Sequence, residues 1–330
     1  MRLSVCLIVL WLATVASIAS AQNEQPDNPV ANAFFSAHKV VFLGDSITWQ
    51  GEFLATLEES LIANGKPFPK ILNFGLQSET CSGDSEPAHP WPRPNVHERL
   101  GRLLEKVQPD LLVVNFGMND GIYHPFDQTR FENYQAGINK IIEAADNSGG
   151  KLKVILVTPP PFDALPLKQK GALVGADAKS FSWTEVYENY DEDVLAVYAN
   201  WILEQKDRVA GCIDLRTPML ADLARRRESN PDFFYAADGV HVDSQGHKLI
   251  GQSIAEALGV TPSQHSNAEL FQLIRQRQCI LRDSGLETVG HKRPNVKKGL
   301  PPEEAAAEAA KLNERLAEIV DQQKQTQDAK

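Results

Sequence analysis

Five short apolar runs constrain the fold of this chain more than any other feature of its sequence. Each run is five to seven residues long, each is followed by a segment with helical spacing of apolar residues, and most stop at Gly or Pro. The runs cover residues 39–43, 70–74, 111–116, 152–157 and 209–215. Apolar strands that alternate with helices form a parallel sheet covered on both faces, and right-handed crossovers make it doubly wound. We therefore predict an α/β fold, a three-layer α/β/α sandwich with a five-stranded parallel sheet.

The segments between these runs predict helices and two long loops. The helices are expected at residues 51–64, 96–107, 131–145, 217–227 and 244–258, and the loops at 77–94 and 161–180. A stripe of aromatic and apolar residues follows the second loop at helical spacing, and it predicts one more helix that faces the core. The stripe consists of Trp183, Tyr187, Tyr190, Val194, Tyr198 and Trp201.

The two ends of the chain differ from this alternating part. Residues 1–21 resemble a secretory signal, because Arg2 precedes an apolar stretch that ends at the small residues Ala19-Ser20-Ala21. Cleavage near Ala21 would give an exported protein, periplasmic or secreted, with no membrane span in the mature chain. An uncleaved anchor is the alternative, although the stretch is short for a span. We expect a lead-in over residues 22–37, one α/β domain over 38–260, and a helical extension over 261–330 with helices at 267–282 and 302–324.

The negative charge of the chain disfavours several classes of binding partner. The formal net charge is -10, so binding of nucleic acid through its phosphates is not expected. Acidic polysaccharides and anionic membrane surfaces are also disfavoured, unless a local basic patch exists.

Three cysteines remain after the expected cleavage, and they do not form a disulfide framework. Cys212 lies in an apolar run and is expected to be a buried thiol, whereas a bridge between Cys81 and Cys279 stays open. No Cys or His spacing indicates a zinc site, and we expect neither a metal nor another cofactor.

The turn after the first apolar run carries the first candidate for chemistry. The run stops at Gly44, and Ser46 follows at the start of an expected helix. The carboxyl edge of a parallel sheet is where ligands bind in open α/β folds. The free N–H groups of a helix start also favour a developing negative charge. Ser46 is therefore a candidate nucleophile, and the alternative is that Ser46 or Thr48 only caps a helix.

Four polar signals follow expected strands in this order along the chain. They are Gly44-Asp45-Ser46, Gly75, Gly117-Met118-Asn119-Asp120 and Asp238-Gly239-Val240-His241. Over roughly residues 38–259 this pattern resembles the GDSL-type serine esterases, also called SGNH hydrolases. The resemblance implies a flavodoxin-like sandwich and a serine hydrolase mechanism without a cofactor.

The resemblance assigns a role to each of five residues. Ser46 matches the nucleophile, His241 the general base and Asp238 the acid that orients it. Gly75 and Asn119 match the donors of an oxyanion hole, with the Ser46 N–H as the third. One position departs from the family pattern, because Ser78 stands where a further glycine is common, which leaves the shape of that loop open.

The expected function is the hydrolysis of acyl esters, in particular acetyl esters on carbohydrate, by an exported enzyme. The substrate would be a small molecule or polysaccharide that carries the ester. Trp49 and Trp91 are candidates to line a pocket for a sugar ring or an apolar tail, or else they only pack against the loop. The alternatives are a lipase, lysophospholipase or thioesterase with the same residues, and a noncatalytic carbohydrate-binding or scaffold protein.

Overall fold

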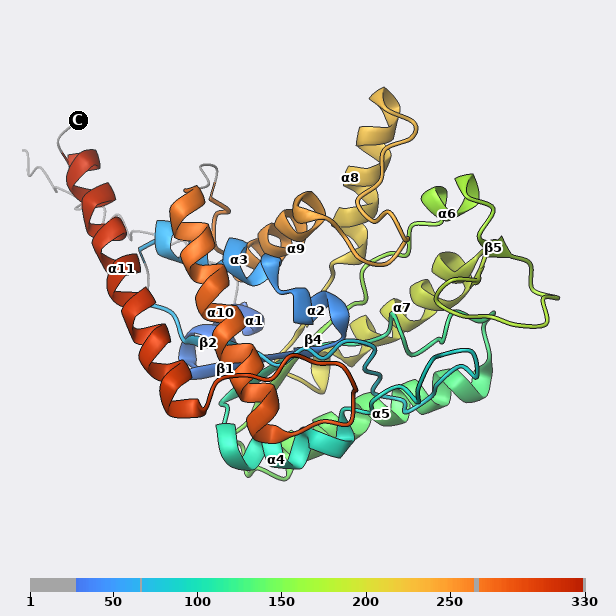
Figure 1. The fold of residues 1–330 in the computed structure, drawn as a ribbon, viewed down its shortest axis with the longest axis horizontal. Helices are drawn as coiled ribbons and strands as arrows, with labels where there is room; N and C mark the ends of the chain where they lie inside the picture. Colours follow the sequence, from blue (N-terminus) through green and yellow to red (C-terminus); the bar gives the residue numbers. More distant parts are fainter. Residues whose placement is uncertain (1–27, 66, 264–266, 329–330) are drawn as a thin grey trace, which may run out of the picture.

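A central parallel sheet lies between two layers of helices in the computed structural model of the protein (Figure 1), which describes residues 28–65, 67–263 and 267–328. The five strands follow the order β2-β1-β3-β4-β7. They are β1 (Lys39–Gly44), β2 (Lys70–Asn73), β3 (Leu111–Asn115), β4 (Lys153–Val157) and β7 (Cys212–Ile213). Every neighbouring pair is parallel, so the predicted α/β class and the predicted sheet are confirmed. Only β7 is much shorter than the apolar run that predicted it.

Helices cover both faces of this sheet. In Figure 1 α3 (Glu52–Ala63) and α9 (Ser244–Ala257) lie on one side, and α4 (His97–Val107) and α5 (Gln128–Asp146) lie on the other. The remaining helices are α1 (Pro29–Ser36), α2 (Ser46–Gln50), α6 (Leu165–Gln169), α7 (Ala196–Glu204), α8 (Arg216–Ser229), α10 (Ala268–Val289) and α11 (Pro302–Asp328). α7 joins the layer of α5, because the rings of Tyr134 and Tyr198 stack with their centroids 4.4 Å apart.

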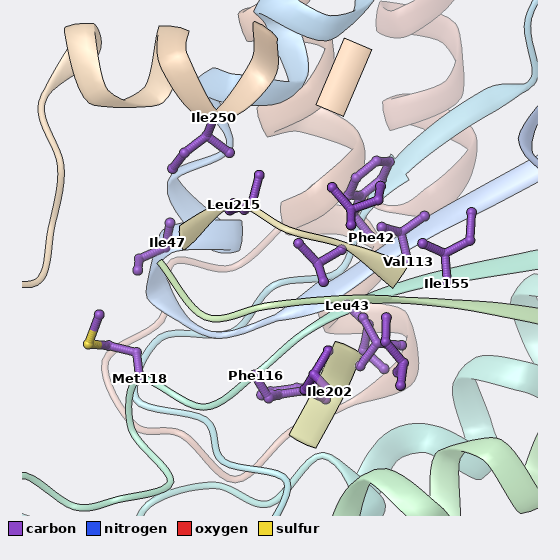
Figure 2. Close-up of a cluster of buried hydrophobic side chains, with 14 of the residues drawn as sticks. Phe42, Leu43, Ile47, Val113, Phe116, Met118, Ile155, Ile202, Leu215 and Ile250 are labelled. Atoms are coloured by element: carbon purple, nitrogen blue, oxygen red, sulfur yellow. The ribbon is translucent and has the colours of Figure 1, made fainter. Parts of the chain in front are cut away.

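The strands are apolar on both sides because both sides are buried. Phe42 pairs in register with Val113, and Val113 with Ile155, and Figure 2 shows these three side chains together on one side of the sheet. Phe116 and Ile202 lie on the opposite side in the same view. A side chain that is buried on either face of a strand removes apolar surface from water, which is the main driving force for folding.

The expectation of a single helix through the aromatic stripe is wrong in its first part. Ser182 and Glu185 close a tight turn by exchanging backbone hydrogen bonds of 3.0 and 3.1 Å. β6 (Val186–Tyr187) then pairs with β5 (Leu173–Val174) in a small parallel sheet, and Trp183 is 48% exposed. A π-helical turn, η1 (Tyr190–Leu195), leads into α7. Trp183 is therefore the exposed member of the stripe, whereas Tyr187 is buried in the core from β6 and the members from Tyr190 onward lie in η1 and α7. Aromatic spacing of three to four residues does not exclude a turn and a strand.

Other segments are more ordered than the sequence predicted. The expected loop at residues 161–180 contains α6 and β5, and the lead-in contains α1. All three cysteines in the described residues are free thiols, so the bridge between Cys81 and Cys279 does not form. Cys212 is half-buried rather than buried, and its thiol donates a hydrogen bond to the Ile202 carbonyl.

The prediction of an export signal falls on residues that the structure does not describe. The signal-like residues 1–21 lie outside the described residues. Within the described ranges, none of the helices combines the length and the apolar character that crossing a bilayer requires.

The C-terminal helices are attached to the short helix that carries Ser46. α10 packs on α3 and β2, and α11 packs on α10. Arg282 Nη1 donates a 2.6 Å hydrogen bond to the Trp49 carbonyl, and Arg275 Nη1 donates one of 2.7 Å to the Gln50 carbonyl. These carbonyls are at the end of α2, where a helix leaves its last acceptors unpaired and where positive charge is favourable. The guanidinium of Arg282 also lies 4.2 Å from the centroid of the Trp49 ring.

A buried ion pair supports the segment that follows β2. Arg99 on α4 is 1% exposed and donates from Nε to Glu79 Oε1 at 2.7 Å. It also donates to the Phe74 carbonyl at 2.7 Å. Glu79 is fully buried, so the charge of its carboxylate is compensated mainly by this guanidinium.

Arg99→Met should therefore destabilise the fold by about 3–5 kcal/mol, because it leaves a buried carboxylate without its partner. Urea unfolding followed by circular dichroism measures the change. The matched control is Arg225→Met, which removes an ion pair to Asp222 from a side chain that is 66% exposed; its cost should stay below about 1 kcal/mol. Equal losses in the two variants would contradict this account of Arg99.

Candidate active site

Ser46 lies at the carboxyl end of β1, as the first residue of α2. The Asp45 side chain caps this helix by accepting a 2.9 Å hydrogen bond from the Ile47 N–H, as Asp commonly does at a helix start. The capping role is therefore filled by Asp45, and the Ser46 hydroxyl is free for another partner. The Ser46 residue is only 9% exposed.

His241 brings its imidazole to this hydroxyl from a loop that precedes α9. Its Nε2 lies 2.8 Å from Ser46 Oγ, although the two residues are 195 positions apart in the sequence. Its Nδ1 lies 2.7 Å from Asp238 Oδ2. Asp238 Oδ1 accepts hydrogen bonds from the N–H groups of Val240 and His241, at 3.0 and 2.8 Å, which fixes the carboxylate on the loop.

This chain of hydrogen bonds assigns the protons of the imidazole. A carboxylate only accepts hydrogen bonds, so Nδ1 carries the proton that faces Asp238. In the neutral ring Nε2 is then an acceptor, and the Ser46 hydroxyl donates to it. This is the arrangement in which a histidine can remove a proton from a serine.

The two ionisable partners shift each other's pKa. Burial alone would raise the pKa of Asp238, but the hydrogen bond and the charge of His241 outweigh it and lower the pKa to about 2. Burial alone would lower the pKa of His241, but the hydrogen bond and the charge of Asp238 outweigh it, and the result is a raised pKa. The carboxylate is therefore ionised in the neutral range of pH, and it favours the protonated imidazole.

Asn119 follows β3 and points a side-chain amide toward the same place. Its Oδ1 accepts a 2.9 Å hydrogen bond from the Tyr123 hydroxyl, and its Nδ2 donates one of 3.2 Å to the Glu79 carbonyl. These two contacts fix which end of the amide is the donor. An amide nitrogen has two hydrogens, so one remains for a ligand.

Gly75 does not offer its N–H to the cavity. That group donates a 2.8 Å hydrogen bond to Asn73 Oδ1. The glycine is instead required by packing, because a Cβ at this position would lie 2.2 Å from the backbone nitrogen of Trp49. The expectation that Gly75 is an oxyanion donor is therefore corrected: its N–H already has a partner within the chain.

Ser78, with its neighbour Gln77, is where this loop lines the cavity. It has a left-handed backbone with φ of 63°, the conformation that a glycine adopts without strain. Within the described residues its N–H has no hydrogen-bond partner, and its carbonyl accepts from Arg93 Nη1 at 3.3 Å. The only sequence signal for Ser78 is its place where the family often carries a glycine.

A cavity of about 210 Å³ connects these groups. Its lining consists of Ser46, Gln77, Ser78, His89, Pro90, Trp91, Arg93, Asn119, Tyr123, Trp183, His241 and Arg293. Trp91 thus lies where the sequence analysis expected an aromatic lining, and Trp183 was missed because it was assigned to a buried helix. Trp49 is not part of this lining; its ring lies under Arg282 instead.

Two larger cavities lie elsewhere and have no comparable set of reactive groups. One of about 420 Å³ lies between α1, α5 and β4, and one of about 830 Å³ lies between α3, α10 and α11. In the described part of the chain, no group of three His, Cys, Asp or Glu side chains is arranged to hold a metal ion. The arrangement around Ser46 fits acyl transfer through a serine.

Comparisons with known proteins agree with this fold and assign the family. The chain is similar to a gut microbial diltiazem-metabolizing enzyme, with 20% identity and a TM-score of 0.50, over 67% of this chain and 47% of that one. It is also similar to the acetyl xylan esterase AlAXEase, with 20% identity and a TM-score of 0.48, over 66% of this chain and 98% of that one. A carbohydrate acetylesterase family member from Sinorhizobium meliloti aligns with 18% identity and a TM-score of 0.46, over 67% and 99% of the two chains.

The chain spans about half the length of the first of these proteins. A search of curated proteins finds no match. The model of the GDSL-like lipase/acylhydrolase family matches residues 42–249, which is more than half of the chain and includes every residue of the hydrogen-bonded chain from Ser46 to Asp238. The protein therefore belongs to the GDSL-like lipase/acylhydrolase family.

Proposed function

We propose that this protein is a serine esterase in which Ser46, His241 and Asp238 form the catalytic triad. The observation that carries the proposal is the continuous hydrogen-bonded chain from Ser46 Oγ through both nitrogens of His241 to Asp238. It lies beside a cavity whose lining includes Ser78 and Asn119, which have N–H hydrogens available for a ligand. A nucleophile, a base, an orienting acid and oxyanion donors are the complete set that acyl transfer requires.

In the first half of the reaction, Ser46 Oγ attacks the carbonyl carbon of the ester while His241 Nε2 takes the hydroxyl proton. The carbonyl oxygen becomes an oxyanion, and it is stabilised by three donors: the N–H groups of Ser46 and Ser78 and the amide of Asn119. The intermediate then expels the alcohol, which receives the proton from His241. An acyl group is left on Ser46.

In the second half, a water molecule attacks the acyl group and gives its proton to His241. A second oxyanion forms in the same place and collapses, which releases the carboxylic acid and returns the proton to Ser46 Oγ. Asp238 stays ionised throughout and stabilises the imidazolium that forms in each half. The products are one alcohol and one acid for each ester and water consumed.

The size of the cavity favours a short acyl group such as acetyl. Pockets that enclose drug-sized ligands have volumes of about 300–1,000 Å³, and this one is about 210 Å³. Trp91 and Trp183 offer aromatic faces beside it, which supports a carbohydrate as the alcohol part of the ester. The pattern of residues 1–21 supports export of the enzyme to the periplasm or the medium.

Ser46→Ala should reduce the hydrolysis of 4-nitrophenyl acetate by about 10⁴-fold or more, because no other group can form the acyl-enzyme. A panel of acetyl, butyryl and octanoyl esters, measured on the wild type and the variant together, should show the highest rate for acetyl. A fluorophosphonate probe should label the wild type. It should also label the control variant Ser229→Ala, which removes an exposed serine on α8. Labelling of Ser46→Ala, or its undiminished turnover, would refute the assignment of the nucleophile.

Asn119→Ala should lower kcat by about 10²–10³-fold with little change in KM, because the lost donor acts mainly on the oxyanion. Steady-state kinetics on the acetyl ester measure both constants. Asn133→Ala is the matched control, since that amide donates to Asp84 outside the cavity. A rise in KM alone would mean that Asn119 binds substrate and does not stabilise the transition state.

The dependence of kcat/KM on pH should follow His241, which acts only when neutral. Activity should fall as pH decreases through its raised pKa, with a midpoint above the ordinary value of about 6.5. Asp238→Asn removes the charge that favours the imidazolium, so the midpoint should move to lower pH and the plateau should drop by about 10²-fold or more. The control is Asp243→Asn, which changes a helix-capping carboxylate on the same loop and should leave the midpoint unchanged. If the midpoint did not move in Asp238→Asn, the proposed role of Asp238 would be contradicted.

A further inference from the structure

Arg293 reaches the cavity beside Ser46 from outside the part of the chain that matches the family. It lies in the link between α10 and α11, which we call the C-terminal link (residues 290–301), and it is part of the cavity lining. The link is attached to the body of the protein at its start. Arg102 on α4 donates to the Gly290 carbonyl at 3.1 Å, and Lys292 donates to Glu98 Oε1 at 2.7 Å.

The guanidinium of Arg293 has almost no partner in the chain. Among the described residues it makes no ion pair, and its one hydrogen bond, from Nη1 to the carbonyl of the adjacent Pro294, is 2.8 Å long. Its Nε is buried without a hydrogen-bond partner. The group lies 5.3 Å from the centroid of the Trp91 ring, and burial lowers its pKa. Arg293 is thus a half-buried cation that stacks on an indole ring and has hydrogen-bond donors without acceptors. Such a group can bind an anion.

The other cationic side chain in the lining has a different role. Arg93 is 6% exposed and donates to both oxygens of Glu86, each at 2.6 Å. Its charge is therefore neutralised within the chain, and it holds the Ser78 loop. His89 also lines the cavity, and its pKa is lowered by burial first and further by the charges of Arg93 and Arg293, so it is neutral in the neutral range of pH. Among the described residues no carboxylate pairs with Arg293, so Arg293 supplies uncompensated positive charge at the cavity wall.

We propose that Arg293 binds an anionic group of the substrate, so that the preferred substrates are acyl esters of acidic sugars. This inference rests on the proposed esterase function of the same cavity. The planar guanidinium suits a carboxylate or a sulfate, to which it can donate two parallel hydrogen bonds. Trp91 lies beside it and Trp183 is 48% exposed in the same lining, which provides aromatic surface for the sugar ring. The net charge of the chain is -10, so the basic spot is local to the site.

The test compares one neutral and two anionic acetyl esters on the same sugar ring. The substrates are acetylated methyl glucoside, acetylated methyl glucuronide and acetylated glucose 6-sulfate, and the readout is kcat/KM for each anionic ester divided by kcat/KM for the neutral one. In Arg293→Met this ratio should fall by about tenfold for at least one anionic ester, mainly through KM, because the variant keeps the length of the side chain and loses its charge. Whichever anionic ester loses more identifies the anion as carboxylate or sulfate.

Lys298→Met is the matched control, because it removes one positive charge from the same C-terminal link. Lys298 is exposed, and it is not part of the cavity lining. Its ratios should equal those of the wild type. Added salt should lower the wild-type ratio and have much less effect on the ratio of Arg293→Met.

Two results would overturn the proposal for Arg293. The first is a wild type that cleaves the neutral ester and shows no higher kcat/KM for either anionic ester. The second is an Arg293→Met variant that loses activity equally on all three esters, which would mean that the arginine only holds the C-terminal link against Trp91. The proposed esterase function fails in a different way, by an absence of Ser46-dependent cleavage of any ester.

Discussion

The hydrogen bond between Ser46 Oγ and His241 Nε2 is 2.8 Å long, and it joins the first residue of α2 to a loop 195 residues further along the chain. Several elements hold its two ends together. β1 is paired on both sides, by β2 and β3, and it delivers Ser46 to the carboxyl edge of the sheet. The loop of His241 is held by α9, which packs on α3, and by a 2.9 Å hydrogen bond from the Asp163 N–H to the Gly239 carbonyl. Two segments from opposite ends of the family domain thus converge: the sheet positions Ser46, and α9 together with the Asp163–Gly239 hydrogen bond positions His241.

The sheet and much of this site could be predicted from the sequence because both depend on local patterns. A run such as 111–116 has no polar face, so it fits only a strand that is buried on both sides. Parallel strands place all their carboxyl ends at one edge, and so the polar residues that follow them meet there. For this reason Ser46 and Asn119, which follow β1 and β3, line one cavity together with His241.

The remaining features depend on contacts that leave little trace in the sequence. A glycine in a sequence indicates that another group lies close to the backbone, but it does not identify that group. At Gly75 the close group is the backbone of Trp49 and not a ligand. Ser78 has a left-handed backbone that its residue type does not suggest. The aromatic spacing at residues 183–201 fits a helix, yet β6 interrupts it because Val186 and Tyr187 find partners in β5. Arg293 reaches the cavity because α10 packs against the domain and positions the link that follows it. The periodicity of apolar residues predicts the helix but not where it packs.

The attachment of α10 to α2 has a consequence for how this protein loses its structure. The last carbonyls of α2 are occupied by the guanidinium groups of Arg275 and Arg282, and α2 has only five residues of its own. A helix that short has little intrinsic stability in water, so its persistence is tied to the neighbour that covers it. Local opening of the C-terminal helices should therefore expose the amides of α2 to solvent exchange at the same time. The segment outside the family domain would then set the lifetime of the geometry around the serine.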